Sequence, residues 1–162
     1  MALTFANKSE ADEIARMANE IWHEYFPSII GLKQTEYMIM KFQTARSIRQ
    51  QMDEGFQYGF IFDGDRKAGY FAIRPEEDAL FMGRLYIHSG FRGKGLGSQA
   101  LQEMLRIGRD LGLKRMYLRV NVRNEGAIAT YEKNGFTIAE RDSIVDIGEG
   151  YVMHDHIYEH VY

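Results

Sequence analysis

Arg92-Gly93-Lys94-Gly95-Leu96-Gly97 is the stretch that decides the fold of this chain. It follows a strand-like run, Leu85–Ile87, and precedes a helical pattern. Three glycines in five residues remove side chains where the backbone must approach a ligand closely. The first turn of the following helix directs its unpaired N–H groups and the positive end of its dipole to the same point. The stretch therefore predicts a binding site for a phosphate or pyrophosphate.

The residues after this loop have the period of a helix with one buried face. Gly112 stands where a left-handed residue would end that helix. The positions of the apolar face are Leu101, Met104, Leu105, Gly108 and Leu111. The unit as a whole is a strand, a phosphate loop and a helix.

A second segment, 124–136, contains another short helix, with Asn124 as its N-cap and Gly135 just past its end. Together the two segments resemble those of the GNAT superfamily of acetyl-CoA-dependent N-acetyltransferases. The first resembles that family's pyrophosphate loop, and the second its Asn-x-x-Ala-x-x-x-Tyr-x-x-x-Gly-Phe segment. The matching positions are Arg92, Gly95, Gly97, Asn124, Ala127, Tyr131, Gly135 and Phe136.

The resemblance implies a single N-acetyltransferase domain over residues 1–162. Its class would be α/β, the GNAT fold, in which helices flank a mixed central β-sheet with a splayed strand pair. The strands at 80–87 and 115–120 would splay apart, and the pantetheine arm of acetyl-CoA would lie between them. The implied activity is transfer of an acetyl group from acetyl-CoA to a primary amine, by direct attack in a ternary complex.

The rest of the pattern predicts two helices and then strands. The first helix starts at Ser9 and ends before Pro27, and the second runs from 35 to 52 with one apolar side. A hairpin turn at 63–66 joins two of the strands that precede the phosphate loop. Strands are expected at 3–5, 57–62, 67–74, 80–87, 115–120, 137–141 and near 151–158.

The composition is that of a globular protein, with 45% hydrophobic and 27% charged residues among 162. The chain has no cysteine, which excludes disulfides, a thiolate nucleophile and cysteine metal sites. Its polar N-terminal stretch and the lack of a long apolar run predict a cytoplasmic protein without a membrane span. A formal net charge of −3 argues against a general nucleic-acid binder.

Charge is distributed unevenly along the chain. Nine Lys or Arg and two acids lie between Arg84 and Arg123, whereas six acids and one Arg lie between Glu140 and Glu159. The basic stretch suits a polyanionic cofactor, and the acidic stretch suits a small cationic acceptor such as a polyamine. The alternative is that these charges are solvated surface groups.

The expected cofactor site comprises the loop and its flanks. The resemblance places backbone N–H groups of a bulged strand, near Tyr86 and Ile87, against the thioester carbonyl, and Asn124 against the pantetheine arm. The loop would bind the pyrophosphate through its N–H groups. Its members are Arg92, Gly93, Lys94, Gly95, Leu96, Gly97 and Ser98. Without a ligand, the same residues would form a tight strand–helix turn.

Two residues are candidate catalytic groups. The resemblance places the hydroxyl of Tyr131 near the cofactor sulfur, where a phenol could protonate the departing thiolate. The alternative for Tyr131 is an aromatic core residue. The strand 81–87 contains no acid, so the base is expected to be ordered water, with His88 as a second candidate.

Five residues are candidates for contact with the acceptor. Glu24 and Tyr25 end the first helix, and Asp146, Glu149 and Asp155 could bind a second ammonium group of the acceptor or accept its proton through water. The histidines at 154, 156 and 160 lack further ligands at a recognisable spacing, so no metal is expected. A homodimer through the aromatic-rich final strand is plausible because an exposed strand edge can pair with its copy.

Two other functions are considered. Gly95-x-Gly97-x-x-Ala100 matches a loose dinucleotide-binding pattern, but the preceding hairpin strands and the lack of a following acid argue against a nicotinamide-dependent oxidoreductase. A nucleotide hydrolase is less favoured, because glycine rather than Ser or Thr follows Lys94. A non-catalytic module that senses acetyl-CoA or docks a partner also fits the motifs.

Overall fold

The computed structural model describes residues 3–162, and Met1 and Ala2 lie outside the described part. Seven strands of the described chain form one sheet in the order β1-β2-β3-β4-β5-β7-β6. Neighbouring strands are antiparallel, except that β4 and β5 are parallel. The strands are β1 (Leu3–Phe5), β2 (Gln57–Asp63), β3 (Arg66–Pro75), β4 (Ala79–Ile87), β5 (Arg115–Asn121), β6 (Thr137–Gly148) and β7 (Tyr151–Val161).

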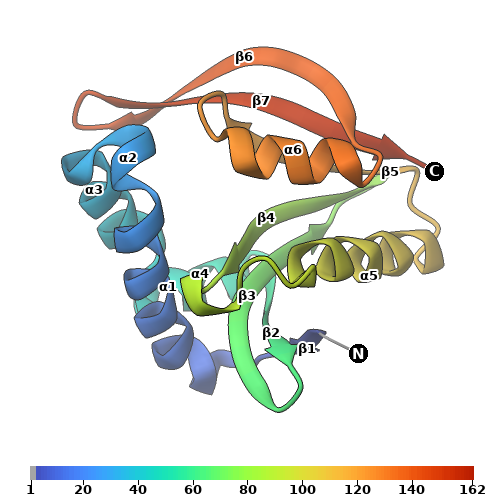
Figure 1. Cartoon of the computed structure of the whole chain (residues 1–162), viewed down its shortest axis with the longest axis horizontal. Coiled ribbons are helices and arrows are strands. Elements are labelled where there is room, and N and C mark those ends of the chain that lie inside the picture. Colours follow the sequence, from blue (N-terminus) through green and yellow to red (C-terminus); the bar gives the residue numbers. More distant parts are fainter. Residues whose placement is uncertain (1–2) are drawn as a thin grey trace.

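Helices flank this sheet, as Figure 1 shows. The helices α1 to α4 pack together on one face, with α1 against β3, whereas α5 contacts β2, β4 and β5. In Figure 1, α6 lies beneath the long β6–β7 hairpin. The helices are α1 (Ala11–Tyr25), α2 (Pro27–Ile30), α3 (Leu32–Phe42), α4 (Ala45–Asp53), α5 (Leu96–Asp110) and α6 (Glu125–Lys133), with 3-10 turns η1 (Lys8–Glu10) and η2 (Ser89–Phe91).

Alternate side chains of β3 belong to two separate apolar cores, one on each face of the sheet. Phe71 and Ile73 belong to the core on the α5 side, and Tyr70 and Ala72 belong to the core on the α1 side. All four side chains are fully buried. Successive side chains of a strand point to opposite faces, so β3 carries apolar residues on both.

A bulge interrupts β4 at Gly83. The register of the two strands pairs Ala72 with Arg84 but Ile73 with Met82, which leaves Gly83 as the extra residue. A bulge shifts by one residue the face to which every later side chain points.

The side chains of β4 show this change of face. Met82, before the bulge, packs in the core on the α5 side, and after the bulge Leu85 packs there too. Tyr86 packs instead against the core on the α1 side. Arg84 lies two residues before Tyr86 and therefore shares its face. Without the extra residue at Gly83, Arg84 and Tyr86 would point toward α5.

The expected splay of two strands is confirmed. β4 and β5 pair from Ala79 with Arg115 to Met82 with Leu118, and no further. Beyond this point β5 continues along β7, up to the pairing of Asn121 with Asp155. The second half of β4 therefore diverges from β5 and opens the sheet.

The predicted helices around the phosphate loop are confirmed, and the first two predicted helices need correction. The predicted start at Ser9 lies in the 3-10 turn η1, which Asn7 caps in a capping box with Glu10, and α1 itself begins at Ala11. The single helix expected at 35–52 is two helices, α3 and α4. They are separate because the Thr44 hydroxyl accepts a hydrogen bond from the Ser47 N–H at 3.1 Å and starts a new helix there.

The last two strands also differ from the prediction. β6 extends to Gly148, beyond the expected end at Arg141, because three register shifts let it follow β7 past polar residues. The final strand, β7, lies between β5 and β6 and so has no free edge. The expectation that this strand could pair with a second copy through an exposed edge is wrong, since the edge strands of the described sheet are β1 and β6. Across residues 3–162, no helix is both long enough and apolar enough to cross a membrane.

Candidate active site

The phosphate loop connects η2 to α5 and leaves the first turn of α5 uncapped. Gly93 and Gly95 both have φ of 79°, a left-handed conformation that glycine adopts without strain. No side chain caps α5, whose first N–H groups lack intrahelical partners. An added Cβ at Gly97 would meet nothing within 4 Å. The loop therefore fits an anionic group such as a pyrophosphate.

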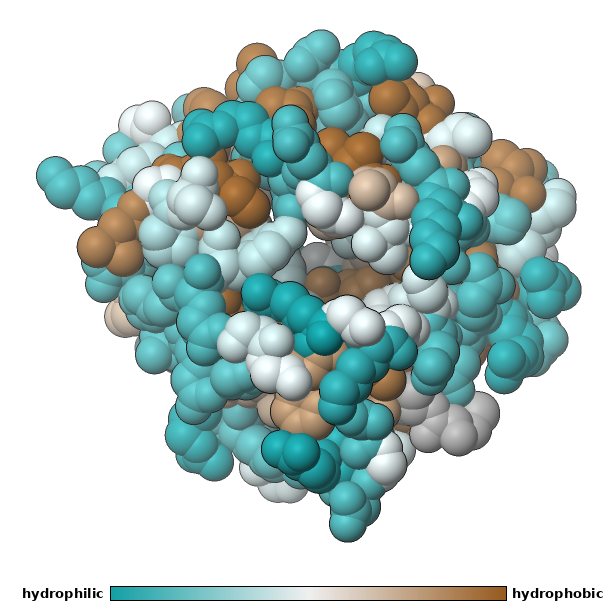
Figure 2. All heavy atoms as spheres, in the orientation of Figure 1, coloured by the Kyte–Doolittle hydropathy of each residue, from teal (hydrophilic) through white to brown (hydrophobic). Residues whose placement is uncertain are grey.

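A cavity of about 640 Å³ lies at the opening between β4 and β5. Figure 2 shows the hollow on the face of the molecule in view. The cavity is lined by residues of α1, α3, β4, the phosphate loop, β5, α6 and β7. The expected cofactor residues that line it are Tyr86, Ile87, Arg92, Gly93, Gly95, Leu96, Gly97, Ser98, Asn124 and Tyr131.

Lys94 is the exception among the expected cofactor residues. It does not line the cavity, and its Nζ lies 3.1 Å from a carboxylate oxygen of Asp63 on the neighbouring hairpin. Arg92 lines the cavity, and its Nε donates a 3.0 Å hydrogen bond to the carbonyl oxygen of Ile87. This bond ties the loop to the end of β4.

The bulge lies earlier in β4 than the expected position near Tyr86 and Ile87, because the extra residue is Gly83. The N–H of His88 donates to the Ala68 carbonyl of β3, at 2.8 Å. In an antiparallel pair, alternate residues direct both backbone groups toward the partner strand. The N–H of Ile87 therefore points away from β3, toward the opening. A carbonyl oxygen in the opening would meet this donor.

Tyr131 lies on α6 with a buried ring. Burial, reinforced by the neighbouring phenols of Tyr86 and Tyr25, raises the pKa of the Tyr131 hydroxyl well above its usual value. That hydroxyl makes no hydrogen bond within residues 3–162 and belongs to the cavity lining. Burial also raises the pKa of Tyr86 to about 12. Both phenols therefore keep their protons near neutral pH.

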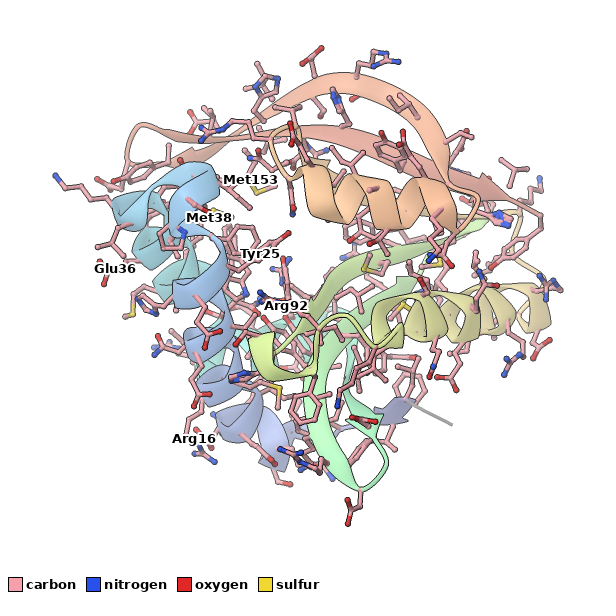
Figure 3. All side chains as sticks on the ribbon, viewed as in Figure 1. Arg16, Tyr25, Glu36, Met38, Arg92 and Met153 are labelled. Atoms are coloured by element: carbon pink, nitrogen blue, oxygen red, sulfur yellow. The ribbon has the colours of Figure 1, made fainter. Side chains whose placement is uncertain are left out.

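Tyr25 joins α1 to α6 across the cavity. Its hydroxyl donates a short hydrogen bond to Oδ1 of Asn124, which also accepts from the Ala127 N–H at 3.4 Å and so caps α6. The guanidinium of Arg92 lies 5.0 Å from the centroid of the Tyr25 ring. Figure 3 shows both side chains directed into the space between α1 and the phosphate loop. Tyr25 therefore lines the cavity, and its predicted role in acceptor binding stays a prediction.

The structure does not bring the other expected catalytic and acceptor residues together. His88 is outside the cavity lining, and its Nε2 lies 2.9 Å from a carboxylate oxygen of Glu20 on the surface. Glu24, Asp146 and Glu149 are exposed and do not line the cavity. Asp146 instead accepts a hydrogen bond from the Gly148 N–H in the β6–β7 turn.

Asp155 is buried and lines the cavity, but it already has a cationic partner. The Nε of Arg119 lies 3.1 Å from a carboxylate oxygen of Asp155. Burial raises the pKa of Asp155, and the adjacent Arg119 opposes that shift. The carboxylate is therefore largely committed to Arg119.

The terminal histidines do not converge on a common point with further ligands: His154 and His156 both contact Asp142, and His160 packs elsewhere. His154 lies 2.8 Å from a carboxylate oxygen of Asp142, and Nδ1 of His156 accepts from the Asp142 N–H. His160 packs beside the ring of Phe136. No group of three or more His, Cys, Asp or Glu in the described chain has the arrangement of a metal site.

Sequence reasoning missed two parts of the cavity. Arg84 lines it, although the sequence places that arginine in a strand without showing which face it occupies. An apolar wall faces the same space, formed by Trp22, Phe26, Ile30, Met38 and Met153. An arginine in an otherwise apolar strand is a signal that could have identified Arg84. The apolar wall had no such signal, because segments distant in sequence form it.

Comparison with known proteins agrees with this geometry. The model of the acetyltransferase (GNAT) family matches residues 15–136. An uncharacterised N-acetyltransferase of Mycobacterium bovis is 32% identical over 132 residues, which cover 80% of this chain and 85% of that protein. The mycothiol acetyltransferase of Corynebacterium efficiens is 36% identical over 90 residues, 54% of this chain. That match spans 30% of the mycothiol enzyme, so the chain corresponds to under a third of it.

Solved structures share the fold. The PaiA N-acetyltransferase of Thermoplasma acidophilum, solved in complex with coenzyme A, superposes with a TM-score of 0.80. The two chains are 20% identical, and the match covers 100% of each. An identity this low establishes a common fold and leaves the acceptor open.

Proposed function

Because the chain belongs to the GNAT acetyltransferase family, whose members use acetyl-CoA, we propose that it transfers the acetyl group to the primary amine of a small molecule. The observation that supports this most is the placement of the Tyr131 hydroxyl in the cavity that also contains the uncapped N-terminus of α5. We also propose that residues 1–162 act as one domain, in the cytoplasm, where acetyl-CoA is available.

The residues of the cavity fit the donor in three ways. The N-terminus of α5 and its glycines suit the pyrophosphate, and the diverging strands β4 and β5 leave room for the pantetheine arm. The backbone N–H of Ile87, which points away from β3, would donate to the thioester oxygen. Acetyl-CoA supplies the activated acetyl group.

Tyr131 would assist departure of the thiol. The amine nitrogen forms a bond to the acetyl carbon as the carbon–sulfur bond breaks, and the sulfur leaves with the electron pair. The nitrogen, which attacks as the neutral amine, becomes positively charged in the bond-forming step and releases a proton to water. The Tyr131 hydroxyl donates its proton to the departing sulfur and regains a proton from that water. Its raised pKa keeps the hydroxyl protonated near neutral pH.

Neither β4 nor His88 provides a side chain in the cavity that could accept the proton of the amine. β4 contains no acid, and His88 lies outside the cavity lining. We propose that the amine loses its proton to water before it attacks. The acceptor must then bind as the free base, which ties the rate to the pKa of the amine.

The acidic stretch between Glu140 and Glu159 gives weak support to a polyamine acceptor. Of the three acidic candidates, Asp155 lines the cavity, and it is paired with Arg119. Polyamines therefore serve as comparison acceptors in the test below.

The test is release of thiol from acetyl-CoA, followed with a chromogenic disulfide, across polyamines, amino acids, aminoglycosides and peptides. The protein has no cysteine and adds no background signal. Amine-dependent release is the expected result. Binding of acetyl-CoA without release from any amine would contradict the proposed reaction and favour a sensor. Lack of binding would contradict the donor site as well.

A further inference from the structure

Arg84 is a cation of the cavity without an anionic partner. Its Nη1 donates to the carbonyl oxygen of Gly83 at 2.9 Å, and the hydroxyl of Tyr58 contacts the guanidinium. Its Nε is shielded from solvent and has no hydrogen-bond partner. No carboxylate of residues 3–162 forms an ion pair with it.

Other partly buried arginines of the sheet differ in this respect. Arg74 lies 3.0 Å from a carboxylate oxygen of Glu76, and Arg115 lies 3.3 Å from one of Glu159. Arg119 is paired with Asp155. A guanidinium withdrawn from water is costly unless an anion offsets its charge. Arg84 is half-buried, with its Nε shielded from solvent, so an anion in the cavity would offset a charge that the described chain leaves unpaired.

The charge of the cavity lining is consistent with such an anion. Four cationic side chains line it, Arg84, Arg92, Arg119 and Lys133, against the single carboxylate of Asp155. Arg119 neutralises that carboxylate. Arg92 belongs to the phosphate loop and Lys133 to the end of α6, near the donor. Arg84 is left as the uncompensated charge on the α1 face of β4, which is the acceptor side.

The wall of the cavity on the α1 side is largely apolar. Tyr86 shares its face of β4 and packs edge-on against Trp22, with ring centroids 5.4 Å apart. Figure 3 shows Met38 of α3 and Met153 of β7 on the side of the cavity where those elements approach each other. Both methionines line the cavity. An apolar side chain of an acceptor would contact this wall.

We infer that Arg84 binds a carboxylate of the acceptor, and that the acceptor is a small amino acid with an apolar side chain. This inference rests on the acetyl transfer proposed above. A planar guanidinium pairs with a carboxylate through its N–H donors, which gives a directed, charge-assisted contact. A polyamine would instead bring further positive charge to a cavity that already has an excess.

The first experiment compares acceptors that differ only in the carboxylate. We would measure kcat/KM for L-leucine, L-methionine and L-phenylalanine, for their amides, and for spermidine. We expect the wild-type protein to prefer each amino acid over its amide by about tenfold or more, as for a charge-assisted hydrogen-bonded pair. In Arg84→Gln, kcat/KM should fall more for the amino acids than for the amides, so that this preference disappears.

Two further variants separate recognition from misfolding. Arg84→Lys keeps the charge but loses the planar pair of donors, so it should retain part of the preference. Arg74→Gln is the matched control, because Arg74 is a partly buried arginine outside the cavity lining. It should keep the full preference. If Arg84→Gln lowers kcat/KM equally for the amino acids and for their amides, the inference is overturned.

A second readout does not depend on turnover. Trp22 is the one tryptophan of the chain and lines the cavity, so its fluorescence reports binding there. We expect N-acetyl-L-leucine to bind more tightly than N-acetyl-L-leucinamide, and the difference to vanish in Arg84→Gln.

The outcomes distinguish the two proposals. Release with amides or spermidine at equal or higher kcat/KM than with amino acids would overturn the inference and leave acetyl transfer intact. No release with any amine would overturn the proposed function. The fluorescence titration would then decide whether Arg84 binds a carboxylate.

Discussion

At the scale of single residues, Tyr131 combines a buried ring with a hydroxyl that has no hydrogen-bond partner in the described chain. The hydroxyl is not among the solvent-shielded polar atoms that lack a partner, so it is open to the cavity. A ligand atom that arrives with the donor could contact it there. The alternative, an aromatic residue that serves only the core, accounts for the contact with Phe136 but not for the free hydroxyl.

Tyr131→Phe should lower kcat about tenfold or more, because the departing sulfur loses its proton donor. The dissociation constant for acetyl-CoA should stay nearly constant. Tyr117→Phe is the matched control, since Tyr117 is a strand tyrosine whose hydroxyl donates to Glu76 outside the cavity lining. Unchanged kcat in Tyr131→Phe would remove this hydroxyl from the mechanism.

The pH dependence should reflect the amine and not the tyrosines. With water as the base, kcat/KM should rise about tenfold per pH unit below the pKa of the acceptor amine. At pH values up to about 10, kcat/KM should show no descending limb, because the pKa of Tyr86 is about 12 and that of Tyr131 is also raised. A descending limb between about pH 7 and 9 would contradict this and require an acid with an ordinary pKa.

The same tyrosines affect stability at high pH. Their folded pKa values exceed the unfolded value of about 10, so the folded state retains protons that the unfolded state loses. The stability they contribute is present below about pH 10 and is lost as the pH rises toward their folded values. Thermal unfolding of wild type and Tyr131→Phe in this range should show a smaller loss in the variant.

At the scale of elements, the loop before α5 depends on two separate properties of glycine. Gly93 and Gly95 supply left-handed backbone, whereas Gly97 has no positive φ and leaves open space beside the helix start. A side chain at Gly97 would therefore fit the unliganded protein. Its cost would arise where the ligand approaches the backbone.

Gly97→Ala should raise the KM for acetyl-CoA about tenfold or more while the melting temperature stays equal or rises slightly, because alanine favours helix over glycine by about 0.5–1 kcal/mol. Gly90→Ala is the control. Gly90 also has open space around an added Cβ and lies outside the cavity lining. If both variants bind acetyl-CoA like the wild type, the pyrophosphate is not bound at this helix start.

At the scale of the whole molecule, the sheet leaves β1 and β6 as edge strands of the described chain. The β6–β7 hairpin also exposes apolar side chains, with Ile144 62% and Val152 45% accessible. Exposed apolar groups beside a free strand edge favour association. The expected homodimer would therefore use the β6–β7 hairpin, and not the edge of β7.

Ile144→Lys should convert this dimer to a monomer, measured by light scattering after size exclusion at two protein concentrations. A charge placed on an edge strand disfavours pairing with a second copy. Leu111→Lys is a control, because Leu111 is also exposed, 56%, but lies at the end of α5. A monomeric wild type at both concentrations would contradict the prediction.

The sequence by itself determined the features that depend on neighbouring residues. Caps, turns and periodicity predicted the phosphate loop, the helix after it and the helix that begins at Asn124. They also predicted the hairpin at 63–66 and the order of the elements. Such signals act over a few residues, which is why they can be read without the fold. The break between α3 and α4 is also local, and the capping sequence that starts at Thr44 would have indicated it.

The tertiary structure decided which side chains meet in the cavity. One extra residue, Gly83, turns Arg84 and Tyr86 toward α1, and the insertion of β7 beside β5 pairs Asp155 with Arg119. Both outcomes depend on strand register between segments far apart in the chain. A shift of one residue reverses the face of every later side chain, so composition and periodicity could not predict which charges face the acceptor.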